Sequence, residues 1–443
     1  MQTRRESRPF AVTHRGILAV AVPMTLAYLS TPLLGFADMT VIGRLGDPAL
    51  LGGVALGAIV FDFIFATFNF LRAGTTGFTA QALGAGDRRE IAAIVLRALV
   101  LAAVAGLAAI LLQVPILAAA RAGLGGSPEV QAALADYFTV RILSTPFALV
   151  NYVLLGWLVG LGRSGVALLL QTVLNGLNIL FTVWFVLGLG HGVVGAAWGT
   201  TLGEAATAVI GLAIAARVLS RERLPRRAAI FDRHALWRMV AVNRDIMIRS
   251  FVLLFAFSFF SARGAAMGDV VLGANAILMN FFLIGGYFLD GFAAAAEQYA
   301  GRAVGAHYRP AFDRSVRLTV LWGFLLAVPA TLVFLLAGPA LIDFMTTSPA
   351  VRETARTYLV WAALTPVAGV LAFQMDGVFI GATWSRDMRN MMLVSLVLFL
   401  AVWAVAEPLL GTHGLWLALL VFLSARGVSL AWRCRVRAAE TFA

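Results

Sequence analysis

The feature that most constrains the fold of this chain is a succession of long apolar stretches. A helix that crosses the hydrocarbon core of a bilayer needs about 20 mainly apolar residues. Of the 443 residues, 61% are hydrophobic and only 13% are charged, whereas a soluble domain is nearer half apolar and a quarter charged. The sequence therefore predicts an all-α polytopic membrane protein surrounded by membrane lipid, and it excludes a soluble enzyme.

Hydropathy and turn signals divide the chain into twelve predicted transmembrane helices. The arginines before the first helix superficially resemble the start of a signal peptide, but the apolar run is too long and no clean cleavage site follows. We therefore expect the first helix to be retained. The approximate ranges are 16–41, 50–73, 91–120, 137–161, 166–189, 193–219, 246–267, 270–298, 315–341, 355–381, 391–410 and 414–432.

The basic residues set the predicted orientation. All 34 are arginine, because the sequence contains no lysine. Without lysine there is no P-loop, which excludes a self-contained ATP-driven pump. With both termini in the cytoplasm, 22 arginines fall on the cytoplasmic side and 5 on the opposite side, as the positive-inside rule requires. We predict a multi-pass protein of the bacterial inner (cytoplasmic) membrane with this orientation. The arginines form no single patch, so no nucleic-acid partner is expected.

The two halves of the sequence repeat each other. GDPALLGGVALGAI at 46 is similar to GDVVLGANAIL at 268, and three further pairs of segments keep offsets of 220 to 222 residues. Each repeat holds six spans, an even number, so both halves have the same orientation, as in transporters built from parallel repeats. The predicted domains are an N-terminal six-helix lobe (1–219), a cytoplasmic linker (220–245) and a C-terminal six-helix lobe (246–443).

The first predicted span carries a buried acid and a proline. An ionisable residue at bilayer depth costs at least ~2.5 kcal/mol, so each one is a functional candidate. Asp38 lies near the end of the span, and the alternative is that the first loop simply solvates it. Pro23, fifteen residues earlier, removes a backbone hydrogen bond and can bend the helix. A bendable helix with a titratable acid is suited to a protonation switch.

A polar stripe follows one face of the fifth predicted span, because its four polar residues are spaced four, three and four apart. Thr200 and Glu204 of the sixth span could face the same interior. The alternative is that these residues only hydrogen-bond neighbouring helices, which is common in membranes. The stripe consists of Gln171, Asn175, Asn178 and Thr182.

The second half has its own acidic candidates. Asp290 and Glu297 share a face of the eighth span, and Asp376 lies in the tenth. The alternative is that Asp290 and Asp376 form structural ion pairs with an arginine such as Arg249.

The remaining polar residues indicate no enzyme and no metal. Asp62 and Asn69 share a face of the second span, and the alternative to a functional role is that they pair with Arg72 at the helix end. The five histidines lack metal-ligand spacing, and the single cysteine, Cys434, cannot form an intrachain disulfide. We expect no cofactor.

Four segments resemble those of the multidrug and toxic compound extrusion (MATE) transporters, and of their DinF-like branch in particular. They are FNFLRAGTTGFTAQALGAGD at 68, NRDIMIRS at 243, LDGFAAAAE at 289 and MDGVFIGATWSRDMRN at 375. The resemblance covers nearly the whole chain. It implies two six-helix bundles that form a V around a central cleft, and export of drugs or other amphipathic compounds by proton or sodium antiport.

The resemblance also implies roles for particular residues. Asp38 matches the carboxylate of the family's first helix, Pro23 its helix-bending proline, Asn178 its fifth-helix asparagine and Thr200 its sixth-helix threonine. Thr182 is a departure, because many members carry a second carboxylate there.

A sodium site would lose one carboxylate by that departure, so we predict that the coupling ion is a proton. We expect the protein to be a monomer and an antiporter of small amphipathic molecules. The alternatives are sodium coupling, a dedicated exporter of an organic acid or other metabolite, and a lipid-linked precursor flippase of the same superfamily.

Overall fold

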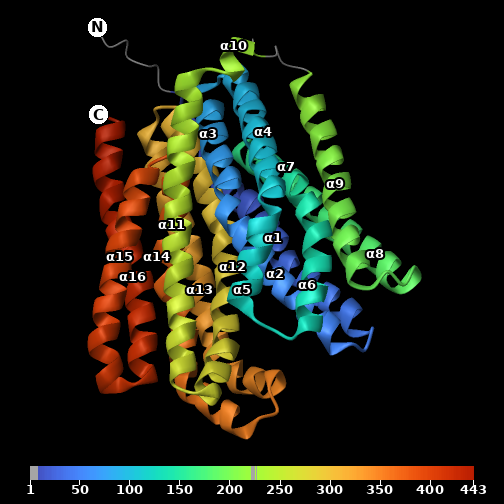
Figure 1. Ribbon diagram of the computed structural model, residues 1–443. Coiled ribbons are helices and arrows are strands. Elements are labelled where there is room, and N and C mark those ends of the chain that lie inside the picture. Colours follow the sequence, from blue (N-terminus) through green and yellow to red (C-terminus); the bar gives the residue numbers. More distant parts are fainter. Residues whose placement is uncertain (1–7, 221–224, 226) are drawn as a thin grey trace. The chain divides into compact units, whose positions relative to one another are not determined.

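The computed structural model describes residues 8–220, 225 and 227–443, and the regular structure of this part is entirely helical. Twelve helical stretches in it are long and apolar enough to cross a membrane, which confirms the predicted number (Figure 1). The predictions for the arginines at 4 and 5, and for those at 221, 223 and 226 of the linker, concern residues outside the described part.

The first half of the chain forms the following helices. They are α1 (His14–Gly43), α2 (Pro48–Phe68), α3 (Phe70–Ala85), α4 (Arg88–Leu111), α5 (Gln113–Leu124), α6 (Pro128–Arg141), the 3₁₀ turn η1 (Ile142–Ser144), α7 (Thr145–Gly160), α8 (Ser164–Val183), the π-helical turn η2 (Trp184–Gly188) and α9 (Gly192–Leu219).

The second half contains longer and less interrupted helices. They are α10 (Arg227–Ile230), α11 (Arg233–Ala266), α12 (Asp269–Gly305), α13 (Arg309–Met345), α14 (Pro349–Gly381), α15 (Ser385–Leu410) and α16 (Thr412–Thr441).

Several helices extend beyond their predicted ranges. The seventh span was expected from residue 246, but α11 begins at Arg233. The reason is that hydropathy reports the apolar part of a helix, whereas capping and backbone hydrogen bonds decide where it ends. Asp87, for example, accepts a hydrogen bond from the backbone N–H of Glu90 (2.9 Å) and so caps α4. The predicted helix 91–120 is also interrupted, because α4 ends at Leu111.

The chain divides into two compact units. One comprises residues 1–25, 83–86 and 240–443, and the other comprises 26–82 and 87–239. The first part of α1 thus belongs to the unit formed mainly by the second half, and the division within α1 falls two residues after Pro23. The helix itself is continuous across that proline. The domain limits 1–219, 220–245 and 246–443 stay a prediction.

Glycine pairs four residues apart allow close helix packing in both halves. A Cβ atom on any of these glycines would collide with backbone of the neighbouring helix, and small residues at such spacing are how membrane helices approach closely. The contacts of α7 with α3 and those of α14 with α12 involve residues that are 221 positions apart in the sequence, which is the offset found in the sequence repeat. The sets are Gly156 and Gly160 of α7 against Arg72 and Thr76 of α3, and Gly377 and Gly381 of α14 against Ala293 and Glu297 of α12.

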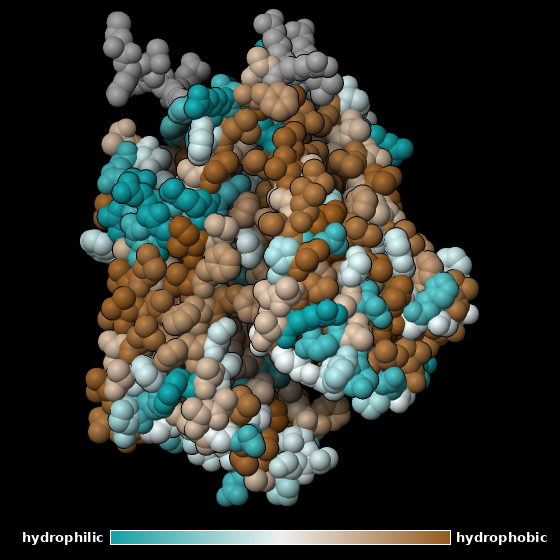
Figure 2. Space-filling view, in the orientation of Figure 1, coloured by the Kyte–Doolittle hydropathy of each residue, from teal (hydrophilic) through white to brown (hydrophobic). Residues whose placement is uncertain are grey.

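The surface is consistent with a lipid environment. Large apolar side chains are widely exposed, including Leu336 (84%) and Phe344 (90%), which water would penalise but lipid does not. Figure 2 shows apolar residues over much of the visible face and hydrophilic residues mainly toward the helix ends. The chain is therefore a multi-pass membrane protein.

Candidate functional site

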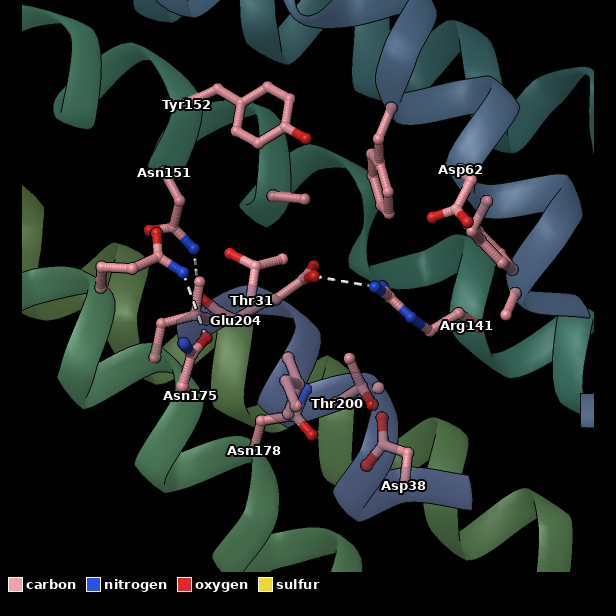
Figure 3. Close-up of a pocket in the computed structure, with 18 of the residues that line it drawn as sticks. Thr31, Asp38, Asp62, Arg141, Asn151, Tyr152, Asn175, Asn178, Thr200 and Glu204 are labelled. Atoms are coloured by element: carbon pink, nitrogen blue, oxygen red, sulfur yellow. Dashed lines mark hydrogen bonds and ion pairs between the residues drawn. The ribbon is translucent and has the colours of Figure 1, made fainter. Parts of the chain in front are cut away.

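A cavity of about 500 Å³ lies within the unit formed by residues 26–82 and 87–239. Its walls come from α1, α2, α3, α6, α7, α8 and α9, and they include Asp38, Asn178 and Thr200 (Figure 3). Three of the four residues that we predicted for ion coupling therefore share one cavity, although they come from three different helices.

The close approach of α8 and α9 brings these residues together. A Cβ atom on Gly199 would lie 2.6 Å from the backbone N of Thr182, and one on Gly203 would lie 3.0 Å from that of Asn178. Because both contacts are to backbone, only glycine permits this separation. The polar stripe of α8 consequently faces the polar residues of α9.

Asp38 lines the cavity instead of extending into the loop after α1. It stands five residues before the helix ends at Gly43, and Figure 3 shows its carboxylate near Thr200. Its Oδ1 atom is buried and has no hydrogen-bond partner among the described residues. A buried oxygen in this condition is costly for a carboxylate and much less so for a carboxylic acid.

The polar stripe has two functions in the structure. Asn175 donates a hydrogen bond to Ser30 of α1 (2.7 Å), and Gln171 donates one to Asn175 (3.1 Å), so this part of the stripe holds helices together. Gln171, Asn175 and Asn178 also all line the cavity. Thr182 does not line the cavity, but it donates a hydrogen bond to the Asn178 side-chain oxygen (3.3 Å) and interacts with the carboxyl group of Asp38. Thr182 therefore supports the wall of the cavity.

Sequence reasoning undervalued a buried ion pair in the same cavity. Arg141 of α6 donates from Nη2 to Oε1 of Glu204 on α9 (2.9 Å), and both side chains are only 9% exposed. The guanidinium also stacks over the rings of Phe61 (5.0 Å) and Phe65 (5.2 Å). The available signal was an ionisable residue within an apolar run, because Arg141 and Glu204 each interrupt a predicted span.

The other charged residues of the cavity are Asp62 and Arg72. Arg72 donates hydrogen bonds to Asn69 (3.3 Å) and to the Tyr28 hydroxyl (3.2 Å), so the expected local pairing of Arg72 with Asn69 is confirmed. Asp62 stands on the cavity wall opposite Glu204 in Figure 3. The cavity thus presents three carboxylates and two guanidinium groups on a largely aromatic and aliphatic lining.

The candidates of the second half lie elsewhere. Asp376 accepts hydrogen bonds from both Arg249 and Arg426, which agrees with the alternative that it is part of a structural ion pair. Glu297 is buried at 3% exposure where α12 packs on α14. Neither these residues nor Asp290 lines the cavity.

Comparisons with known proteins agree with this architecture. A family model described as MatE matches residues 23–184 and 246–410. DNA damage-inducible protein F of Escherichia coli (strain K12) is 40% identical over 427 residues, covering 96% of this chain and 93% of the relative. The probable multidrug resistance protein NorM of Caulobacter vibrioides is 27% identical over 466 residues, with coverage of 96% and 93%.

Solved structures share the fold. One of them, described as the crystal structure of MATE in the bent conformation, superposes with a TM-score of 0.88 at 21% identity and covers 96% of each chain. The family model extends over most of both halves of the sequence, and the relative of the DinF-like branch matches almost end to end. This chain is a membrane transporter that belongs to the MatE family.

Proposed function

We propose that this protein exports amphipathic drugs or xenobiotics across the bacterial inner membrane in exchange for protons, by alternating access through a cleft between its two lobes. The observation that carries the proposal is Asp38, a carboxyl group with a buried, unpartnered oxygen on the wall of a 500 Å³ cavity. A group in that setting changes between a neutral and a charged state as a proton arrives or leaves.

The cavity suits amphipathic substrates. Its wall combines the rings of Tyr28, Phe61, Phe65, Tyr137 and Tyr152 with a set of polar and charged side chains, and pockets for small organic molecules combine apolar surface with polar groups that fix the orientation of the ligand. Aromatic faces attract cationic and planar groups, and the carboxylates outnumber the guanidinium groups. The relative from Caulobacter is named a probable multidrug resistance protein, which supports this substrate class.

The proton is the coupling ion that these residues favour. A sodium ion requires several oxygen ligands, and near Asp38 the helices α8 and α9 offer the neutral oxygens of Asn178 and Thr200. The carboxylate of Glu204 is already paired with Arg141. A proton requires one carboxyl group only. A pH unit supplies ~1.4 kcal/mol per proton and 100 mV another ~2.3 kcal/mol, whereas a hundredfold substrate gradient costs ~2.8 kcal/mol.

In this proposal, helix α1 links the protonation of Asp38 to a conformational change of the protein. The division between the two compact units falls within α1, two residues after Pro23. Proline weakens the helix at this place because it donates no backbone hydrogen bond. Protonation of Asp38, fifteen residues further on, would then change how the second part of α1 packs while the first part stays with residues 240–443.

Transport in vesicles tests the proposal. Purified protein in sodium-free proteoliposomes, loaded with a fluorescent aromatic cation, is expected to move it when a pH gradient is imposed and to stop when an ionophore collapses the gradient. A panel of cations and organic acids defines the substrate class. Transport that follows a sodium gradient and ignores the pH gradient would contradict proton coupling.

A metabolite exporter is the second candidate function. Arg72 and Arg141 on the cavity wall favour it, because they could hold the carboxylate of an organic acid. The three carboxylates on the same wall oppose an anionic substrate. Transport of acids but not of cations in the panel above would select this candidate.

The proposed orientation gives a separate prediction. With Cys434 replaced by Ser, a single cysteine at Ile230 or at Glu440 is expected to react with a membrane-impermeant maleimide in inverted vesicles and not in intact cells. The reason is that the arginine bias places both positions in the cytoplasm. A cysteine at Thr347, in the turn between α13 and α14, is the matched position on the opposite side. Labelling of the first two positions from outside intact cells would reverse the orientation.

A further inference from the structure

Arg141 has a position that its pairing with Glu204 does not fully explain. It is the last residue of α6 and stands near the middle of the membrane span Pro128–Gly160. A guanidinium at such a depth is expensive and in membrane proteins usually marks a functional pathway. The 3₁₀ turn Ile142–Ser144 follows directly, and a 3₁₀ segment within a long helix often marks a hinge.

Arg141 contacts Glu204 through a single hydrogen bond. Its Nη2 atom donates to Oε1 of Glu204 at 2.9 Å, and its Nη1 atom donates to the Ser144 hydroxyl. The second oxygen of Glu204, Oε2, is buried and has no hydrogen-bond partner among the described residues. Arginine–carboxylate pairs are frequently bidentate, whereas this pair has one hydrogen bond. Arginine has five N–H donors, and the contacts with Glu204, Ser144 and Tyr137 leave others available to another acceptor.

Asp38 is such an acceptor. Its Oδ1 atom is, within the described part of the chain, also buried and unpartnered, and Asp38 and Asp62 both interact electrostatically with Arg141. Figure 3 shows the Arg141 side chain directed across the cavity toward Glu204, with Asp62 above and Asp38 below it in this view. A rotation at the 3₁₀ turn that follows α6 would redirect the same guanidinium.

We propose that Arg141 is a positioning residue that acts as the built-in counter-cation of Asp38. Its guanidinium pairs with Glu204 while Asp38 carries a proton, and it moves to Asp38 when that proton leaves for the water of the cavity. The charged form of Asp38 is then stabilised without a metal ion. This inference rests on the proposed proton antiport, in which Asp38 is the group that binds and releases the proton.

The charge balance of the cavity agrees with this exchange. With Asp38 protonated, the two remaining carboxylates and the two guanidinium groups on the wall sum to zero; its ionisation leaves one negative charge. Helix α8 contributes only uncharged residues to this wall. The titratable or charged groups that face Asp38 from the other helices are Asp62 of α2, Arg72 of α3, Tyr137 and Arg141 of α6, Tyr152 of α7 and Glu204 of α9.

The test follows the protonated carboxyl group of Asp38 directly. Infrared difference spectroscopy of the purified protein during a pH titration gives the midpoint of its carboxylic acid band, which is identified by its loss in Asp38→Asn. In Arg141→Gln the midpoint is expected to move to higher pH by about one unit or more, because an opposite charge is lost. In Glu204→Gln it is expected to move to lower pH, because the carboxylate that competes with Asp38 for the guanidinium is removed.

Opposite shifts from the two halves of one ion pair distinguish this proposal from a structural role. Simple loss of packing would shift the midpoints of both variants in the same direction, or would shift neither midpoint. Arg141→Lys is expected to stay nearer the wild-type midpoint than Arg141→Gln. Arg97→Gln is the matched control, because Arg97 is also buried and paired with a glutamate, Glu90 (2.6 Å), but lies outside the cavity and should leave the midpoint unchanged.

The titration midpoints test the role of Arg141 whether or not the protein exports by proton antiport. The titration uses neither substrate nor gradient, so failure of transport would reject the proposed function while the midpoints still decide the role of Arg141. If Arg141→Gln does not fold, Glu204→Gln carries the test alone. An unchanged or raised midpoint in Glu204→Gln, or an unchanged midpoint in a folded Arg141→Gln, would overturn the proposal.

Discussion

Asp38→Asn is expected to abolish export against a substrate gradient while leaving folding and substrate binding largely intact. Asparagine has nearly the size of aspartate and keeps polar atoms at the cavity wall, but it cannot release a proton. The variant is therefore fixed in the neutral form, and the step that couples proton movement to transport is lost. Initial rates of pH-driven transport in proteoliposomes measure the effect, and substrate quenching of tryptophan fluorescence measures binding.

Thr182→Ala is the matched comparison from the same unit. Thr182 donates a hydrogen bond to Asn178 (3.3 Å) and also interacts with the carboxyl group of Asp38, and a hydrogen bond of this kind is worth about 1 kcal/mol. We therefore expect a modest reduction of the transport rate and not its loss. Normal export by Asp38→Asn would show that coupling does not reside in this cavity, and Asp290 or Asp376 would become the candidates.

Asp376→Ala is expected to be the most damaging single change to stability in the second half. Asp376 accepts hydrogen bonds from Arg249 and Arg426, and the side chains of Asp376 and Arg426 are 6% and 3% exposed. Removing the carboxylate leaves buried guanidinium groups without their shared partner, which typically costs about 3–5 kcal/mol. Asp290, which also interacts electrostatically with Arg426, would offset only part of this. Thermal unfolding in detergent is the measurement.

An exposed ion pair provides the control for that experiment. Asp343 pairs with Arg356 (2.6 Å), but its side chain is 38% exposed, so Asp343→Ala is expected to cost no more than about 1 kcal/mol. If Asp376→Ala unfolds at the wild-type temperature but does not transport, then Asp376 is a coupling acid and not a structural one. This outcome would show that an acidic residue of the second half takes part in transport and does not only stabilise the fold.

Much of the fold could be predicted from the sequence because membrane proteins obey simple local rules. A backbone in lipid must satisfy its own hydrogen bonds, so apolar runs of sufficient length can only be helices, and their number follows from counting. The repeat was equally accessible, since the offset of 221 residues relates both the sequence segments and the glycine contacts of α7 and α14. The ends of the helices were harder to predict from the sequence, because polar caps and solvated turns decide them.

The site was only partly predictable. Asp38, Asn178 and Thr200 could be identified because polar residues are rare in apolar spans, and the structure places all three on one cavity. Asp376 could be identified by the same rule, yet it pairs with arginines outside that cavity. Rarity of a polar residue thus indicates that it has a partner, but it does not reveal which partner.

The sequence by itself determined the class of protein, the number of spans, the repeat and the family. These properties depend on hydropathy and on order along the chain, which are one-dimensional quantities. Only the tertiary structure decided that Arg141 meets Glu204, 63 residues away, and that both share a cavity with Asp38. Such an arrangement depends on how far apart α6, α8 and α9 stand and on which way each helix is rotated. Contacts such as that of Gly199 with the backbone of Thr182 fix those distances and rotations, and no local pattern encodes them.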